Sequence, residues 1–250
     1  MKKRNLLHCL IALGAAAWLP SCTTTSPTSK ANPDPRTDET MVAMSKKIAA
    51  AKTIRLTAKH KKDPALGVGS KAENGPIEIT VKRPNQFYCL QPAGDQTREL
   101  AYDGKTLCMI HPGPKHHALE PVRAASISQF ADRVDERFGF RPPIAELLAT
   151  DVLDQLMLNV TSATVTEGEW VGMTRCKRLH FVQEGMTGDL WVGVNDQLPH
   201  RYLLTFTGLK GSPTWDIKLS KWELDGPVDD RLFSKRAAAD STRLKMLKSR

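Results

Sequence analysis

The sequence predicts an α+β fold in which a curved antiparallel sheet, a half-barrel, wraps around a few helices. Three observations predict it. One stretch of helical period opens the folded body, stretches of period two follow, and a second helical stretch divides the strands into two blocks. About ten strands are expected in all. No internal repeat is visible, which argues against solenoids and propellers.

The folded body is expected to begin with a helix over residues 38–51. Met41, Met44 and Ile48 recur on one side at helical spacing. Thr37 stands where its hydroxyl could cap the first turn. The sequence therefore predicts one amphipathic helix ahead of the strands.

Period-two alternation predicts the strands of the first block. Residues 54–58 and 77–81 alternate apolar with polar side chains, which is typical of half-buried antiparallel strands. Asp103-Gly104 separates two further apolar runs and predicts a hairpin with a type I′ turn, because that turn needs a positive φ at both central residues. This turn explains Asp103 without a catalytic role.

The middle of the chain returns to helical spacing. Residues 127–138 follow Ser126 with a helical period, and Pro142-Pro143 is expected to open short helices over 144–150 and 151–158. The strands of the second block are expected at 160–165, 177–182, 189–194, 202–209 and 215–224. In the last of these strands, Trp222 and Leu224 are out of phase with 215–219, so a bulge is expected near Ser220 or Lys221.

The N-terminus has the layout of a bacterial lipoprotein signal. Residues 2–4 are basic, and the apolar stretch 6–19 is too short to span a bilayer as a permanent helix. Leu19-Pro20-Ser21-Cys22 then resembles a lipobox, so Cys22 is predicted to become the N-terminus after cleavage and to be lipidated. Pro20 departs from the lipobox pattern, and a secretory signal with Cys22 as an incidental thiol is the alternative.

Composition divides the rest of the chain. Residues behind Cys22 are rich in proline and almost without apolar side chains, so they cannot offset the entropy of folding and predict a flexible tether. Thr23 stands where an Asp would resemble an inner-membrane retention signal, which favours the outer membrane, facing the periplasm. The expected segments are a signal peptide at 1–21, a tether at 22–36, a half-barrel domain at 37–234 and a basic tail at 235–250.

The positive charge is concentrated at the two ends of the chain. The formal net charge is +9, of which the signal carries three units and the tail, with six basic residues and one acid, carries five. The body is thus nearly neutral, which argues against a nucleic-acid partner. For the tail, a plain disordered terminus is favoured, and the alternative is a mobile tail that contacts an anionic membrane surface or an acidic partner.

No arrangement for catalysis or metal binding is visible. The sequence lacks GxSxG and HExxH, and His111, His116 and His117 are interpreted as histidines at an exposed hairpin end. Cys89, Cys108 and Cys176 are odd in number and lack CxxC spacing, so free buried thiols are favoured over one disulfide. We therefore expect no catalytic residue, no metal and no cofactor.

The candidate ligand site is an apolar sheet face. Large apolar side chains gather in the second block of strands, and alternation places them on a common face with those of an early strand. The alternative is that they fill a core against the helices. The predicted ligand-binding residues are Ile77, Ile79, Val81, Tyr202, Leu204, Phe206, Trp215, Ile217 and Leu219.

Several short motifs resemble a family of predicted periplasmic proteins whose fold is similar to that of the LolA/LolB lipoprotein carriers. They are Arg83-Pro84-Asn85, residues 102–107 (YDGKTL), 143–148 (PIAELL), 172–176 and Leu198-Pro199 with Arg201. The resemblance covers most of 41–233 and implies an apolar cavity that takes acyl chains.

The sequence as a whole predicts a lipid-anchored protein of the cell envelope. Its expected function is that of a non-catalytic binding or carrier module for lipid, lipoprotein acyl chains or another apolar ligand. The alternative is a sensor or scaffold that binds a periplasmic protein partner through the same half-barrel.

Overall fold

The computed structural model describes residues 34–66, 73–93 and 96–248. The predicted signal, Cys22 and most of the predicted tether lie outside these residues. Among the residues that are described, no helix has the length and apolarity needed to span a bilayer.

Twelve strands form a single open sheet in this part of the chain. The first block contains β1 Thr53–Lys62, β2 Glu73–Lys82, β3 Gln86–Ala93, β4 Gln96–Tyr102, β5 Thr106–His111 and β6 His116–Pro121. The second contains β7 Val160–Val171, β8 Thr174–Gln183, β9 Met186–Gly193, β10 Pro199–Thr205 and β11 Thr214–Leu224, and β12 Thr242–Arg243 follows. The spatial order is β12-β6-β5-β4-β3-β2-β1-β11-β10-β9-β8-β7, so the blocks join where β11 returns to β1.

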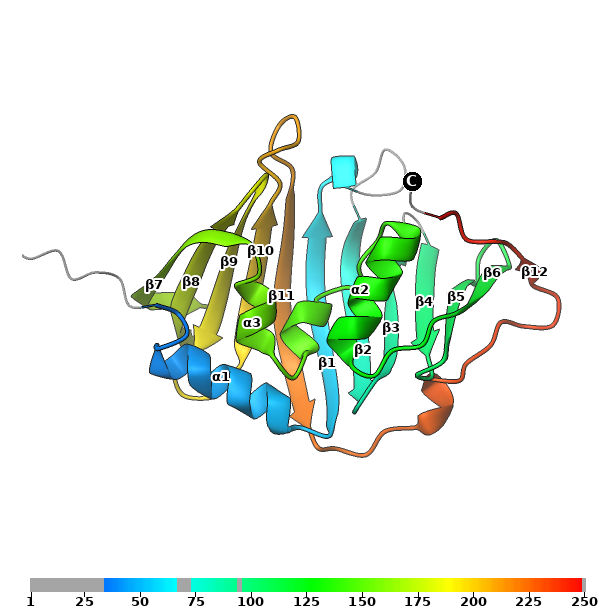
Figure 1. Ribbon diagram of the computed structural model, residues 1–250, viewed down its shortest axis with the longest axis horizontal. Helices are drawn as coiled ribbons and strands as arrows, with labels where there is room; N and C mark the ends of the chain where they lie inside the picture. The colour runs from blue at the N-terminus through cyan, green and yellow to red at the C-terminus, as the bar shows by residue number, and fades with distance from the viewer. Residues whose placement is uncertain (1–33, 67–72, 94–95, 249–250) are drawn as a thin grey trace, which may run out of the picture. The chain divides into compact units, whose positions relative to one another are not determined.

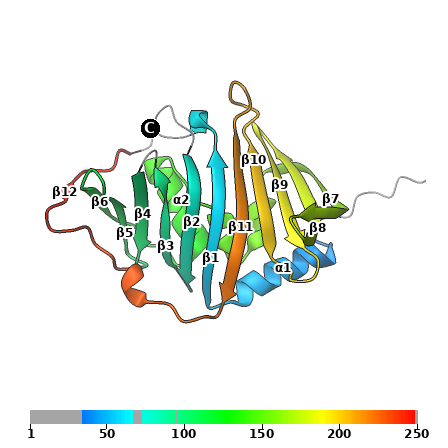
Figure 2. The same ribbon diagram turned by 180° about the vertical axis from the view of Figure 1, so that it is seen from behind.

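All neighbouring strands are antiparallel except β12 and β6, which are parallel. Helices lie on one face of the sheet, which we call the concave face (Figure 1). They are α1 Glu39–Ala50, α2 Ile127–Phe138, the 3₁₀ helix η2 Ala145–Leu148 and α3 Val152–Leu156; two more 3₁₀ turns are η1 Pro64–Leu66 and η3 Asp230–Leu232. Seen from behind, the sheet stands in front of these helices (Figure 2). The predicted α+β half-barrel is confirmed.

The main core lies between the concave face and the helices. Met41, Met44 and Ile48 of α1 are fully buried, as the spacing predicted. Asp38, rather than Thr37, caps this helix, since its carboxylate accepts hydrogen bonds from the backbone N–H groups of residues 40 and 41. Capping by Asp38 also places its negative charge at the positive end of the helix.

Helix α2 packs against the first block through an aromatic stack. The rings of Phe130 and Tyr102 lie 3.9 Å apart between centroids and are nearly parallel. Behind α2 the predicted helices are shorter than expected: 144–150 forms only the 3₁₀ turn η2, and 151–158 only the five residues of α3. Ile144, with a φ of 48°, precedes η2, and Asn159, with a φ of 59°, follows α3. A left-handed backbone interrupts helical hydrogen bonding, so these two residues limit the length of the helical segment.

Two turn predictions had different outcomes. The bulge in β11 is confirmed: Arg55 pairs with Glu223 but Thr57 with Ser220, and Lys221 has a φ of 48°. The prediction of a type I′ turn at Asp103-Gly104 is wrong. Only Gly104 has a positive φ, of 95°, and the Asp103 carboxylate instead accepts from the backbone N–H groups of residues 105 and 106, closing a three-residue loop.

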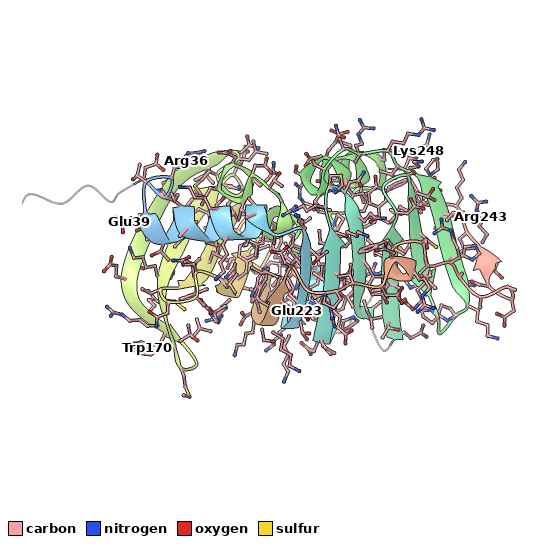
Figure 3. The ribbon with its side chains drawn as sticks, turned by 90° about the horizontal axis from the view of Figure 1, so that it is seen from below. Arg36, Glu39, Trp170, Glu223, Arg243 and Lys248 are labelled. Carbon is pink, nitrogen blue, oxygen red and sulfur yellow. The ribbon has the colours of Figure 1, made fainter. Side chains whose placement is uncertain are left out.

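The C-terminal segment also corrects a prediction. The expected disordered or mobile tail, residues 235–250, packs on the sheet, because Thr242–Arg243 form β12 on the edge of β6. Just ahead of the tail, Phe233 is fully buried on the convex face. Lys235 pairs with Glu99 in the same region. Arg243 and Lys248 lie at the opposite end of the sheet from Arg36 and Glu39 near the start of the described chain (Figure 3). Sequence reasoning missed this packing because the contacts join residues far apart in the chain.

Candidate functional site

A cavity of about 480 Å³ opens between the concave face of the second block and the helical segment. This volume lies within the range of sites for small ligands. The lining side chains come from the part of the sheet formed by β8 to β11, from α2 and from the stretch between α2 and β7. They are Asp135, Arg141, Pro142, Ile144, Glu146, Gln155, Leu156, Leu158, Asn159, Phe181, Gln183, Met186, Tyr202, Leu204, Phe206 and Trp215.

The sheet side of the cavity follows from strand alternation. Tyr202 and Leu204 point inward from β10, and Leu204 pairs with Trp215 of β11. Phe181 lies further along the face, where it pairs with Gly188 of β9. A Cβ atom on Gly188 would stand 2.1 Å from Cζ of Phe181, so the missing side chain makes room for that ring.

The helical side of the cavity carries most of its polar side chains, and one of them, Glu146, lies beside Tyr202 of the sheet. Glu146 comes two residues after the left-handed Ile144. Burial, and then the negative charge of Glu146, raises the pKa of Tyr202 well above its ordinary value. Burial likewise raises the pKa of Glu146. The phenol therefore stays a hydrogen-bond donor at neutral pH.

The nine predicted ligand residues separate into two groups. Tyr202, Leu204, Phe206 and Trp215 line the cavity together. The remaining five do not line it; they lie in the closed core with at most 4% of their surface exposed, and they are Ile77, Ile79, Val81, Ile217 and Leu219. The ligand-binding role of the first group stays a prediction.

A second cavity of about 340 Å³ adjoins the first. The two share Arg141, Phe206 and Trp215 among their lining residues. We call the four ionisable side chains of the second cavity from β1, β2 and β4 the polar annex: His60, Lys62, Glu73 and Arg98.

His60 connects the annex to the apolar cavity. The indole N–H of Trp215 donates a hydrogen bond to Nδ1 of His60 over 2.9 Å. Because an indole can only donate, Nδ1 must be unprotonated, and neutral His60 then carries its proton on Nε2. Burial lowers the pKa of His60 to about 4, although the charge of Glu73 acts in the opposite direction. His60 is therefore neutral at pH 7.

Three atoms of the annex lack partners among the described residues. They are Nε2 of His60, Oε1 of Glu73 and Nε of Arg98. His60 and Glu73 have only 5% and 2% of their surface exposed. Buried polar atoms are normally paired, so the annex is built for contacts that the chain does not supply within its described part. Sequence reasoning missed it, although His60 and Glu73 continue the inward alternation of 54–58 and 77–81.

The motifs that carried the family resemblance have structural contacts. Arg83 donates to the backbone carbonyls of Ile48 and Ala149 over 3.2 and 3.1 Å, which ties α1 to the end of η2. The amide of Asn85 donates to the carbonyl of Ala124 over 2.6 Å. These side chains therefore hold helices against the sheet and do not reach the cavity.

The thiols and histidines considered in the sequence form no site in the described part of the chain. Cys89, Cys108 and Cys176 are buried and free. His111 and His116 pair across the β5–β6 hairpin. No group of three or more His, Cys, Asp or Glu side chains there could hold a metal ion.

A family model described as "Predicted periplasmic protein (DUF2092)" matches residues 37–247. No curated protein matches the sequence. Similar solved structures include an uncharacterized conserved protein from Thermus thermophilus (11% identity, 80% of this chain and 94% of that one, TM-score 0.47). Others are LprF from Mycobacterium bovis (13%, 80% and 97%, 0.47) and a LolA superfamily protein from Nitrosomonas europaea (11%, 78% and 97%, 0.35).

Proposed function

Because the chain belongs to the DUF2092 family of predicted periplasmic proteins, we propose that it acts in the periplasm as a non-catalytic carrier or binding protein that takes a lipid acyl chain into the concave cavity. The finer proposal is an outer-membrane lipoprotein anchored through Cys22. The description of the family as periplasmic agrees with the export that the predicted N-terminal signal implies.

The cavity is the observation that carries this proposal. Its sheet wall is formed by large side chains, four of them aromatic: Phe181, Tyr202, Phe206 and Trp215. An acyl chain removed from water gains about 0.8 kcal/mol for each buried methylene group, so a lined apolar cavity is a sufficient source of affinity. No bond needs to be made or broken for such a function.

The cavity mouth also fits a chain that enters and leaves. Leu158 lies at the lining with 57% of its surface exposed, whereas Leu156 beside it is buried. This graded exposure lets an acyl chain stay in contact with apolar side chains from solvent to the interior. A carrier requires such release as much as it requires binding.

The first experiment is to purify the protein natively and extract it for mass spectrometry. A carrier should yield extractable lipid. A protein that is empty but retains one defined envelope protein would instead support the sensor or scaffold function.

A matched pair of variants locates the site. Met186→Trp adds an indole inside the cavity, and Leu209→Trp adds the same ring at a residue that is 49% exposed and does not line it. We expect Met186→Trp to reduce bound lipid severalfold and Leu209→Trp to leave it unchanged, with both variants folded by circular dichroism. Equal lipid content in folded Met186→Trp and wild-type protein would exclude this cavity.

A further inference from the structure

We propose that the polar annex binds the acidic head of a single-chain lipid whose acyl chain occupies the adjoining apolar cavity. This inference rests on the proposed function and names the class of ligand. The shared chemistry is an anionic head, which a fatty acid supplies as a carboxylate and a lysophospholipid supplies as a phosphate.

The adjacency of the two cavities is the first support. Phe206 and Trp215 belong to both linings, so a ligand that lies along them has one end among apolar side chains and the other in the annex. Trp215 itself has this dual character, because its ring lines the apolar cavity while its N–H is bonded to His60. An amphiphile matches this sequence of surfaces better than a wholly apolar molecule does.

The unpaired atoms are the second support. Neutral His60 presents Nε2–H, and Arg98 presents Nε–H, as donors without partners among the described residues. Carboxylate and phosphate oxygens accept such bonds and donate none when fully ionised. Bonds to charged groups are among the stronger ones, so an anionic head is the occupant that gains most from these donors.

Charge is the third support. Lys62 lies 3.6 Å from Glu73 and neutralises it, so among the described residues Arg98 is the charge of the annex without an opposite partner. The four side chains together carry a net charge of +1. Arg141, which both cavities share, is paired with Asp132 over 2.8 Å and adds little. His60 contributes no charge at pH 7, since burial lowers its pKa to about 4. The annex therefore favours one negative charge.

Binding measurements on the full mature chain can test the inference. The probes are palmitate, palmitoyl lysophosphatidic acid and monopalmitoylglycerol, which share one acyl chain and differ only in the head. We expect both acids to bind at least tenfold more tightly than the uncharged glycerol ester. The acid that binds more tightly identifies the head.

Variants test which residues recognise the head. Arg98→Gln should weaken binding of the preferred acid about tenfold and leave monopalmitoylglycerol unchanged, whereas Glu73→Gln should strengthen binding of the acid by removing the negative charge. Arg55→Gln is the control, because Arg55 pairs with Glu223 and does not line the annex. Thermal unfolding verifies that each variant is folded.

The outcomes separate this inference from the proposed function. If all three lipids bind equally and Arg98→Gln weakens none of them selectively, the annex does not recognise the head, although the cavity still binds the chain. If the wild-type protein binds none of the three, the proposed function fails as well. An unchanged affinity in Glu73→Gln together with a selective loss in Arg55→Gln would also overturn the assignment.

Discussion

Trp215 donates its indole N–H to Nδ1 of His60 over 2.9 Å, and this contact joins the apolar cavity to the annex. It holds His60 in the tautomer that presents Nε2–H. A change in the protonation of His60 would break the contact, since both ring nitrogens would then be donors. The hydrogen bond between Trp215 and His60 should therefore be lost at low pH.

The stability of the protein should depend on His60 in acid. Its pKa is about 4 in the folded protein and ordinarily 6.5, so the unfolded chain binds the proton more readily between these values. The free energy of unfolding is therefore unaffected by His60 above pH 6.5. It decreases as the pH falls from 6.5 toward 4, by at most about 3 kcal/mol. Urea unfolding of wild type and His60→Gln across this range measures the difference. Identical pH profiles would contradict the prediction.

Gly188→Ala should damage the cavity from within the sheet. The new methyl group would stand 2.1 Å from Cζ of Phe181, and the ring would have to move. We expect a loss of about 1 to 3 kcal/mol of unfolding free energy, typical of overpacking, together with reduced lipid binding. Gly211→Ala is the control, because it makes the same substitution at a residue where no atom lies near the new Cβ. The positive φ of Gly211 adds a small backbone strain to this control. If Gly188→Ala is as stable and binds as well as wild type, the close contact has no consequence.

Gly104→Val should destabilise the protein more than Asp103→Ala. Gly104 has a φ of 95°, and a Cβ there would approach the side chain of Asn85 at 2.9 Å. Asp103→Ala removes two bonds to backbone N–H groups and the 3.1 Å pairing with Arg236, a loss of about 1 kcal/mol. The midpoints of urea unfolding of the two variants measure which one is less stable. A large loss of binding in Asp103→Ala without loss of stability would make Asp103 a functional residue.

Cys22→Ala should release the protein from the membrane fraction and leave its folded body intact. A diacylglyceryl group gains about 0.8 kcal/mol per buried methylene, and the tether has no comparable apolar surface. Cys9→Ala is the control, because Cys9 lies in the segment that the predicted cleavage removes. Western blots of salt-washed membranes measure the partition. Sedimentation of Cys22→Ala with the washed membranes would refute lipidation.

The sequence contained enough to predict the fold because alternation and helical spacing are local patterns. The same patterns could not separate cavity from core. Leu204 and Leu219 alternate inward in the same way, yet only the first lines the cavity. The difference depends on where the helical segment covers the sheet, and that is set by contacts such as those of Arg83 with Ile48 and Ala149.

The annex and the tail were missed for related reasons. Glu73 looks like an ordinary polar residue at a strand end, and its burial depends on packing by distant elements. Strand β12 has only two residues and no alternation of its own. Its place is set by partners on β6 and by ion pairs such as Arg236 with Asp103. Short strands of this kind carry no period that a sequence can show.

Because β12 pairs with β6, the two edges of the described sheet differ in how readily they could pair with a strand of another molecule. The guanidinium of Arg243 donates to the carbonyl of Leu119, so backbone groups that could template an incoming strand are already engaged. At the other margin, β7 has register shifts after Val160 and Thr166, and such irregular edges pair poorly with a second copy. Removal of the tail by proteolysis would expose β6, whose backbone groups would then be free to pair with the same strand of a second copy.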